Sequence, residues 1–327
     1  MTRVAVMGSN SFSGSHFVAL LLQQGYEVLG ISRSVEIAPP FRPYEQQKPD
    51  TWRFAQVDLN DHVSIHATLR DFAPELVINF AAQSMVGQSW ITPQDWYETN
   101  VVAIAHLGQS LQRLNTLRRY VHVTTPEVYG STQDWIPESD VFHPTTPYAI
   151  SRAAGDQHLM ALQASTGLPI VFTRAANVYG AGQQLFRIIP RALLSARLAR
   201  KLPLDGGGHS IRSFIHISDV ARATLDIAES GTDGLTYHIS TNELVSIRQL
   251  VEKVAELTGV PFAELVVEAG ERVGKDAAYQ LDSSRLRSSF DWTPQISLDD
   301  GLRSTLAWVD ENLDLLSSLP VDYVHKR

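Results

Sequence analysis

The sequence predicts an α/β protein with a Rossmann-like doubly wound parallel sheet and a smaller mixed α/β substrate-binding region. In the first half, short runs rich in Val and Ile alternate with stretches of helical periodicity. These runs are continuously apolar, which is typical of strands buried on both faces of a parallel sheet. A segment rich in Gly and Ser follows the first run directly, where such folds bind phosphates. The 327 residues are enough for about two domains.

The predicted elements of the first half are strands separated by helices. The expected strands are Val4–Met7, Glu27–Ile31, Phe54–Val57, Leu76–Phe80, Tyr120–Val123 and Pro169–Thr173. The expected helices are Gly14–Gln24, Val63–Phe72, Asn100–Leu114, Pro147–Ser165 and Phe186–Ala199, with Gly25 and Gly167 as stop signals.

From about Gly180 the alternation of strands and helices loosens. Ile215–His216, a helix over Asp219–Glu229, a strand over Tyr237–Ile239 and a helix over Ile247–Thr258 predict a second, smaller region. We expect a dinucleotide-binding domain of residues 1–176 with 211–240, and a substrate domain of residues 177–210 with 241–327. Because no free linker separates them, a ligand is expected in the cleft between the two.

Composition excludes several classes of function. The net charge is −8 and no long basic block occurs, so we expect neither a nucleic-acid surface nor an anionic-membrane surface. The chain contains no cysteine, which excludes disulfides, thiolate metal sites and cysteine nucleophiles. Histidines are scattered without acidic partners at ligand spacing, so no metal is expected. Since no signal or membrane segment is visible, we expect a cytoplasmic protein.

The segment after the first strand is a candidate phosphate loop. Gly8, Ser11 and Gly14 are small enough for the backbone to approach a pyrophosphate, and Phe12 lies between them at the start of the expected helix. The N–H groups and the helix dipole would then hold the anion. Ser11 stands where a third glycine is usual, and an ordinary tight turn is the alternative interpretation.

The end of the second strand indicates which dinucleotide is bound. NAD sites place Asp or Glu there, whereas this strand ends in Ser32 and Arg33. Because a guanidinium binds phosphate through paired hydrogen bonds, we expect NADP, with NAD as the alternative. The other interpretation of Arg33 is a solvated loop charge. Asp58 and its neighbour Leu59 follow the third strand and are expected near the adenine end of the cofactor.

A second group of polar residues surrounds the predicted strand Tyr120–Val123. Thr125 and Glu127 follow this strand, and Tyr148 opens a helix with Arg152 at the i+4 position. Residues at this spacing share one helix face, and a cation beside a phenol lowers the pKa of the phenol from about 10. We therefore expect Arg152 to make Tyr148 a base.

With the loop and the strand order, these residues resemble the extended short-chain dehydrogenase/reductase family. In that family the Ser or Thr positions a sugar hydroxyl, the Tyr moves its proton, and a Lys four residues later binds the nicotinamide ribose. The resemblance implies catalytic roles for Thr125, Tyr148 and Arg152, and cofactor contacts for Tyr148 and Arg152. The chain departs from the family at Arg152, where the guanidinium is longer and planar.

The resemblance covers nearly the whole chain and is strongest to nucleotide-sugar 4,6-dehydratases of the GDP-mannose and dTDP-glucose group. Phe80–Ser84 resembles the motif at the end of the fourth strand, which places Ala81 and Ala82 beside the cofactor, and Glu98–Val101 resembles the start of a helix. The segments Arg174–Gly180, Arg212–Val220 and Arg272–Tyr279 resemble those of the substrate region. The substrate contacts implied in this way are Gln83, Ser84, Asn177, Arg212 and Arg272. Arg187 is a further candidate for a diphosphate.

Glu127 separates dehydratases from epimerases within this resemblance. Oxidation at C4 acidifies the C5 proton, which a carboxylate can remove before water leaves from C6 and a hydride returns there. An epimerase needs no such base. Pro126 stands where some members carry an Asp that protonates the leaving hydroxyl, so Glu127 is expected to act as both base and acid.

Two alternative functions stay open. One is a nucleotide-sugar epimerase on the same scaffold, and the other is a cofactor-binding relative that has lost catalysis, as Pro126 and Arg152 would allow. The expected helices Asn100–Leu114 and Pro147–Ser165 resemble the pair that forms a four-helix dimer interface in the family, which implies a homodimer.

Overall fold

A seven-stranded sheet organises the larger part of the molecule. The structure is a computed structural model that describes residues 1–47, 49–132, 134–270 and 280–325. The strands run parallel in the order β12-β7-β5-β4-β1-β2-β3. They are β1 (Arg3–Met7), β2 (Glu27–Ser32), β3 (Trp52–Gln56), β4 (Leu76–Asn79), β5 (Arg119–Thr124), β7 (Ile170–Ala175) and β12 (Thr236–Ile239). This sheet confirms the predicted Rossmann-like fold.

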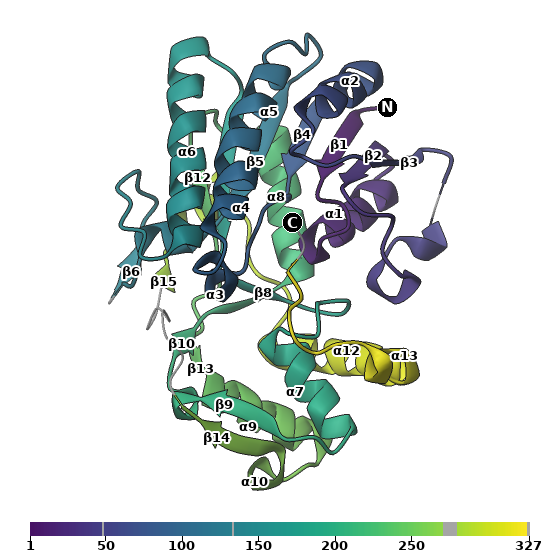
Figure 1. Ribbon diagram of the computed structural model, residues 1–327, viewed down its shortest axis with the longest axis vertical. Coiled ribbons are helices and arrows are strands. Elements are labelled where there is room, and N and C mark those ends of the chain that lie inside the picture. The colour runs from purple at the N-terminus through teal and green to yellow at the C-terminus, as the bar shows by residue number, and fades with distance from the viewer. Residues whose placement is uncertain (48, 133, 271–279, 326–327) are drawn as a thin grey trace.

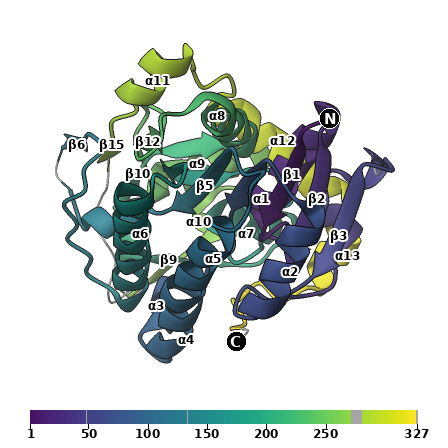
Figure 2. The same cartoon turned by 90° about the horizontal axis from the view of Figure 1, so that it is seen from above.

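Helices cover both faces of the sheet (Figures 1 and 2). They are α1 (Phe12–Gln23), α2 (His62–Phe72), α5 (Ala103–Leu111), α6 (Pro147–Thr166) and α8 (Ile217–Ser230). Val4 and Val6 of β1 pack with α1 and α8, while Ala5 and Met7 pack with α2, α5 and α6. Since successive side chains of a strand point to opposite faces, a strand covered on both sides is apolar throughout. The uninterrupted apolar runs of the sequence have this cause.

The order of the strands reverses around β1. Met7 at its carboxyl end pairs with Ile31 of β2 on one side and with Asn79 of β4 on the other. The chain leaves β1 in one direction across the sheet and later returns to build the other half. Open α/β sheets bind ligands in the crevice at this point.

The second region has a core of its own. Its elements are β8 (Asn177–Tyr179), α7 (Ile188–Arg197), β9 (Leu202–Asp205), β10 (Ile211–Arg212), β11 (Phe214–His216), β13 (Val245–Ser246), α9 (Ile247–Thr258), α10 (Phe262–Leu265), β14 (Val266–Ala269), α12 (Leu298–Glu311) and α13 (Leu313–Ser318). Leu193, Leu250 and Val309 are buried among their side chains. The helix α11 (Ser284–Phe290) instead packs back on the sheet through Leu286.

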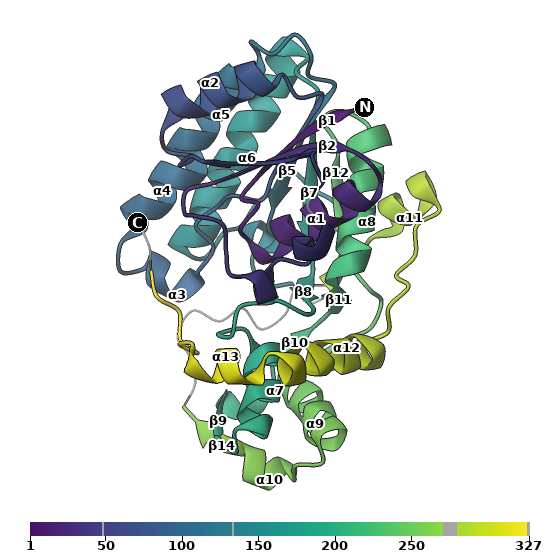
Figure 3. The same cartoon turned by 90° about the vertical axis from the view of Figure 1, so that its right-hand side faces the viewer.

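The last described residues run from the second region back to the first (Figure 3). Asp322 pairs with Arg191 of α7 at 3.2 Å. His325 Nε2 donates a hydrogen bond at 2.9 Å to Asp95 Oδ2, in the short helix α4 (Pro93–Tyr97), and the His325 ring stacks on Trp96. This segment therefore bridges the two regions on one side of the molecule.

Three predicted boundaries differ from the structure. Helix α1 begins at Phe12, before the predicted Gly14, because the Ser11 hydroxyl caps it by accepting a hydrogen bond from the Gly14 N–H at 3.0 Å. The helix predicted over Asn100–Leu114 starts earlier, with a π-helical segment (η3, Glu98–Val102) that passes into α5. Helix α7 is shorter than predicted, since Arg187 is its N-cap. No helix in the described part of the chain is long and apolar enough to cross a membrane.

Candidate active site

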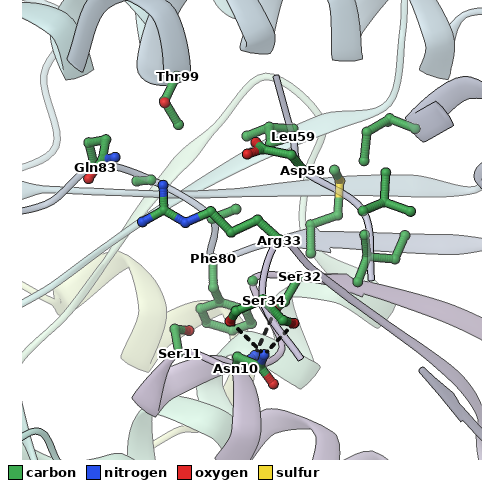
Figure 4. Close-up of a pocket in the computed structure, with 17 residues that line it drawn as sticks. Asn10, Ser11, Ser32, Arg33, Ser34, Asp58, Leu59, Phe80, Gln83 and Thr99 are labelled. Atoms are coloured by element: carbon green, nitrogen blue, oxygen red, sulfur yellow. Dashed lines mark hydrogen bonds between the residues drawn. The ribbon is translucent and has the colours of Figure 1, made fainter. Parts of the chain in front are cut away.

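A pocket lies at the carboxyl ends of β1, β2 and β4, where the strand order reverses. It is lined by residues of the loop after β1 and of the segments that follow β2, β3 and β4 (Figure 4), namely Gly8, Asn10, Ser11, Ser32, Arg33, Ser34, Asp58, Leu59, Phe80, Ala81, Ala82, Gln83 and Thr99 among others. The pocket contains most of the predicted cofactor-binding residues.

The backbone of the loop after β1 fits the cradle of a dinucleotide. Gly8 has φ +75°, and a Cβ atom there would lie 2.6 Å from the Ala81 nitrogen. A Cβ atom on Gly14 would lie 2.2 Å from the Gly8 carbonyl oxygen. Only glycine permits both contacts, so the loop can close tightly beneath the first turn of α1 and present its N–H groups. The residues present therefore fit a pyrophosphate.

Two predicted cofactor residues, Phe12 and Gly14, can reach a bound cofactor through their backbone alone. The Phe12 side chain is buried in the core, contacts the His16 ring and is not part of the pocket lining. Gly14 packs against Gly8 and is likewise absent from the lining. Both belong to the first turn of α1, so what they can offer an anion is the N–H groups of the helix end.

Serine hydroxyls connect the loop after β1 to the end of β2, at the part of the pocket that is expected to bind the adenosine of the cofactor. The Ser32 hydroxyl accepts a hydrogen bond from the Asn10 N–H at 3.0 Å, and the Asn10 side chain donates to Ser34 Oγ at 3.2 Å. Both serines thus hold the phosphate loop against the end of β2. Arg33 is exposed and extends across the pocket towards Gln83 and Thr99 (Figure 4). Asp58 lines the same pocket and caps the turn that follows it by accepting from the Asn60 N–H at 2.9 Å.

The predicted catalytic residues converge from two elements. Thr125 follows β5 and caps the short helix η4 (Pro126–Tyr129), where its hydroxyl accepts a hydrogen bond from the Glu127 N–H at 3.3 Å. Tyr148 lies in the first turn of α6, which Thr146 caps. Tyr148 and Thr125 are buried and hydrogen-bonded to each other, while Glu127 is half-buried. The structure therefore brings together the hydroxyl, phenol and carboxylate that the sequence suggested.

The expected lowering of the Tyr148 pKa is wrong. Burial raises the pKa of the Tyr148 phenol above its ordinary value, and the Glu127 carboxylate raises it further. Arg152, the Thr125 hydrogen bond and Arg187 act in the opposite direction, but they do not offset the loss of solvation. The i+4 spacing placed the cation correctly, whereas the sequence could not show how completely the phenol is buried.

Arg152 is buried beneath Tyr148. Its guanidinium Nη2 donates a hydrogen bond to the Val123 carbonyl oxygen near the end of β5. A lysine at this position would offer a single ammonium group, whereas the guanidinium of Arg152 offers several donors in a fixed plane. Arg152 can therefore bind the strand end with one nitrogen while the others remain for different partners.

Sequence reasoning missed the residue that holds the segment after β4. Asn100 lies in the π-helical turn, and its Oδ1 accepts from the Gln83 N–H at 2.9 Å while its Nδ2 donates to the Gln83 carbonyl at 2.9 Å. The same Nδ2 lies 3.0 Å from Ser151 Oγ on α6. The signal available in the sequence was an Asn near the start of a predicted apolar helix. Asn100 thus ties the pocket wall to the helix of Tyr148.

Three of the predicted substrate residues lie on elements of the second region. Asn177 opens β8, Arg187 caps α7 and Arg212 ends β10. Arg187 is close enough to lower the pKa of Tyr148, so its charge faces the catalytic group. Ser84 is exposed beside the buried Gln83. Arg272 lies outside the described residues.

Comparison with known proteins identifies the family of the chain. The family model described as GDP-mannose 4,6 dehydratase matches residues 6–305. The chain belongs to this family.

Relatives of this dehydratase match it over nearly the whole of both chains. A probable dTDP-glucose 4,6-dehydratase of Sinorhizobium fredii is 31% identical over 95% of this chain and 93% of the relative. The dTDP-glucose 4,6-dehydratase of Haemophilus influenzae is 27% identical over 94% and 98%. The structure of DesIV, a dTDP-glucose 4,6-dehydratase from Streptomyces venezuelae with NAD bound, superposes with a TM-score of 0.89 at 30% identity, over 96% of this chain and 98% of that chain.

These findings confirm the prediction of a nucleotide-sugar 4,6-dehydratase, and hence of an enzyme of the lyase class. The UDP-glucose 4-epimerase of Thermotoga maritima also superposes, with a TM-score of 0.87 over 95% of this chain and 100% of that chain. At 24% identity it shows the shared fold alone. Within the described ranges, no three His, Cys, Asp or Glu side chains are grouped as they would be around a metal ion.

Proposed function

We propose that this dehydratase oxidises C4 of a nucleoside-diphosphate sugar, eliminates water across C5 and C6, and restores a hydride at C6. The position of Glu127 carries the proposal. Its carboxylate is close enough to Tyr148 to raise the pKa of the phenol, so a base for C5 lies beside the group that serves the C4 hydroxyl. Two titratable groups with separate tasks at one site are typical of acid–base catalysis.

The proton steps are assigned to three side chains. Tyr148 takes the proton of the C4 hydroxyl. Thr125 binds the same C4 hydroxyl with the side-chain hydroxyl that also interacts with Tyr148. Glu127 removes the C5 proton and delivers it to the oxygen that leaves from C6 as water, since Pro126 offers no acid there. When the hydride adds at C6, a proton returns to C5, and it balances the proton released from the C4 hydroxyl. When bound, the nicotinamide supplies a hydride acceptor at C4 and a donor at C6, so the reaction has no net redox change.

Replacing Glu127 by Gln tests this assignment. We expect the 4-keto-6-deoxy product to form about 10³ times more slowly, because the C5 base is lost. Oxidation at C4 is spared, so reduced nicotinamide accumulates and is followed by its near-ultraviolet absorbance. Asp140→Asn, an exposed carboxylate in the segment after η4, is the control and should leave turnover unchanged. Unchanged dehydration in Glu127→Gln would contradict the role.

The substrates to compare are dTDP-glucose and GDP-mannose. The relatives reported above are named for dTDP-glucose, whereas the family model is named for GDP-mannose. We propose dTDP-glucose as the first substrate. A sugar inverted at C4 without loss of water would favour the epimerase alternative, and bound cofactor without any product would favour the catalytically impaired alternative.

The proposed cofactor is NADP, with NAD as the alternative. Arg33 lines the pocket beyond the end of β2, and among the described pocket residues Asp58 is the one carboxylate, on the neighbouring strand end. A guanidinium beside the adenosine ribose favours a 2′-phosphate. DesIV binds NAD, so the mass of the nucleotide that co-purifies with the protein decides between the two.

A homodimer through a four-helix bundle is also proposed. Helices α5 and α6 lie side by side (Figure 1), and apolar side chains are exposed on or next to them. They are Trp90, Ile91, Tyr97, Val102 and Ile150. A contiguous apolar face of this kind favours association. The two domains also remain part of the proposal. The dinucleotide-binding domain comprises residues 1–176 with 211–240, and the substrate domain comprises residues 177–210 with 241–327. Helix α11 belongs to the substrate domain but packs on the sheet.

A further inference from the structure

Two fully buried charged residues lie beneath the catalytic groups. Asp156 of α6 and Arg174 of β7 are both 0% exposed, and Arg174 Nη2 lies 2.8 Å from Asp156 Oδ2. Neither residue lines the cofactor pocket. A buried ion pair adds little to stability compared with apolar residues of the same volume, so its presence calls for another explanation.

Asp156 connects α6 to the end of β5. It lies one helical turn after Arg152, and its Oδ2 accepts a hydrogen bond from the Thr124 hydroxyl at 2.9 Å. Thr124 directly precedes Thr125, whose hydroxyl is bonded to Tyr148. The carboxylate therefore fixes the helix that carries Tyr148 against the strand end that carries Thr125.

Arg174 connects the same carboxylate to the far end of η4. Its Nη1 donates a hydrogen bond to the Tyr129 hydroxyl at 2.7 Å, and its guanidinium lies 4.9 Å from the centre of the Tyr129 ring. Tyr129 is the last residue of η4, two positions after Glu127. The ion pair thus holds the segment Thr124–Tyr129 at both ends, with Glu127 between them.

A chain of hydrogen bonds leads from Asn79 to His122, whose ring lies next to the ion pair. Asn79 Nδ2 donates to the Tyr120 hydroxyl at 3.3 Å, and that hydroxyl lies 2.8 Å from His122 Nδ1. His122 Nε2 then faces Asp156 Oδ1 at 3.5 Å. Burial lowers the pKa of His122, so its ring is neutral and supplies no compensating charge. Asn79 also accepts from the Ala81 N–H at 2.9 Å, which links the chain to the pocket wall.

We propose that Asp156 and Arg174 are positioning residues, which keep Glu127 and Thr125 at a working distance from Tyr148 during the reaction. This inference rests on the proposed function, because that function assigns the three groups they hold. Both residues of the ion pair are fully buried, and neither lines the cofactor pocket. It acts through the two ends of η4, where a displacement of about 1 Å is enough to slow catalysis about 100-fold.

The first test is Arg174→Lys, which keeps the charge but replaces a planar fork by one ammonium group. A single ammonium cannot hold Asp156 and the Tyr129 hydroxyl in the present geometry. We expect kcat to fall about 30-fold while KM for the nucleotide sugar changes less than about 2-fold. Asp156→Asn keeps the shape, leaves Arg174 without its anion and should have the larger effect, whereas Asp156→Glu should restore part of kcat.

Arg119→Lys is the matched control. Arg119 lies on the neighbouring strand β5 and its Nε also pairs with a carboxylate, Asp233, at 3.1 Å, but on the far side from η4. We expect kcat to stay within about 2-fold of the original. Thermal unfolding of each variant is measured alongside, so that kcat is compared between folded proteins.

A second measurement does not require turnover. Hydrogen–deuterium exchange of the peptide covering residues 124–130 should be about 10 times faster in Arg174→Lys, with exchange in α9 unchanged. If the original protein forms no dehydrated product, the proposed function fails while this exchange still tests the positioning role. Unchanged exchange at η4, or an unchanged kcat in a folded Arg174→Lys protein, would overturn the inference.

Discussion

The cofactor end and the substrate end of this site are built in different ways. At the cofactor end, backbone packs on backbone, as where Gly8 approaches Ala81 too closely for any side chain. At the substrate end, the candidate contacts are side chains from short elements, such as Arg187 at the start of α7 and Arg212 on β10. A backbone cradle tolerates few substitutions, whereas long side chains adapt to different ligands. We therefore expect substitutions at the cofactor end to be tolerated less well than substitutions at the substrate end.

The proposed catalytic groups lie between these two ends, and their positions are fixed by packing, as they are at the cofactor end. Thr125, Tyr148 and Arg152 are buried and bonded to backbone or to one another. Their positions depend on the packing of α6 against β5. Substitutions should therefore have effects that become smaller from the phosphate loop towards the surface arginines.

In the comparison of the two ends, the largest effect is expected for Gly14→Ala. The new Cβ atom would meet the Gly8 oxygen at 2.2 Å and Ser11 Oγ at 2.9 Å, so the loop and the start of α1 must separate. Affinity for the dinucleotide should fall about 100-fold or more, as measured by calorimetric titration of the nucleotide-free protein. The protein should also lose the nucleotide that co-purifies with it.

Gly25→Ala is the control for backbone strain alone. Gly25 has φ +81°, but no atom lies within 4 Å of its added Cβ. The substitution should lower the free energy of unfolding by about 1 kcal/mol and leave nucleotide affinity unchanged. If Gly14→Ala retained full affinity, the cofactor end would be as adaptable as the substrate end, and the comparison would fail.

An intermediate effect is expected for Arg187→Ala at the substrate end. Loss of one charged contact to a diphosphate should raise KM for the nucleotide sugar about 10-fold, with unchanged thermal stability. Arg187 also lowers the pKa of Tyr148, so its removal raises that pKa further. Because the deprotonated phenol is the active base, the acidic limb of the kcat profile should move to higher pH.

Arg191→Ala provides the comparison for Arg187. Arg191 lies one turn further along α7 and pairs with Asp322 at 3.2 Å, in the segment that returns to α4. We expect KM and the pH profile to stay close to those of the original protein. Equal effects of the two substitutions would show that the charge of α7 as a whole, rather than Arg187, attracts the substrate.

The sequence predicted the parts of this molecule that depend on local pattern. The strands, the glycine loop and the pairing of Tyr148 with Arg152 follow from periodicity and spacing alone. The raised pKa of Tyr148 and the contacts of Asp156 could not be predicted, because they depend on which distant residues cover the phenol and the carboxylate. The early start of α1 was readable from Ser11, a common N-cap residue, once its competing role in a phosphate loop is set aside.

The π-helical turn at Asn100 shows a different limit. A helix-period pattern predicts the helix but not one wider turn within it, and this turn aims Asn100 at both Gln83 and Ser151. Such turns occur often at functional sites. The sequence therefore located the wall of the pocket without the residue that fixes it.

The most selective effect is expected for Arg33→Ala, because it concerns the binding of NADP and hardly that of NAD. Arg33 is exposed and reaches across the adenosine end of the pocket as a flexible side chain, although it belongs to the cofactor end (Figure 4). Its loss should weaken NADP binding about 10-fold and NAD binding less than about 2-fold. The reason is that a guanidinium interacts more strongly with a 2′-phosphate than with a 2′-hydroxyl. Arg53→Ala, on β3 and paired with Glu27 at 3.1 Å, is the control. Equal weakening of both dinucleotides would remove the case for NADP, and it would also show that the backbone cradle, rather than any charged side chain, provides the affinity at this end.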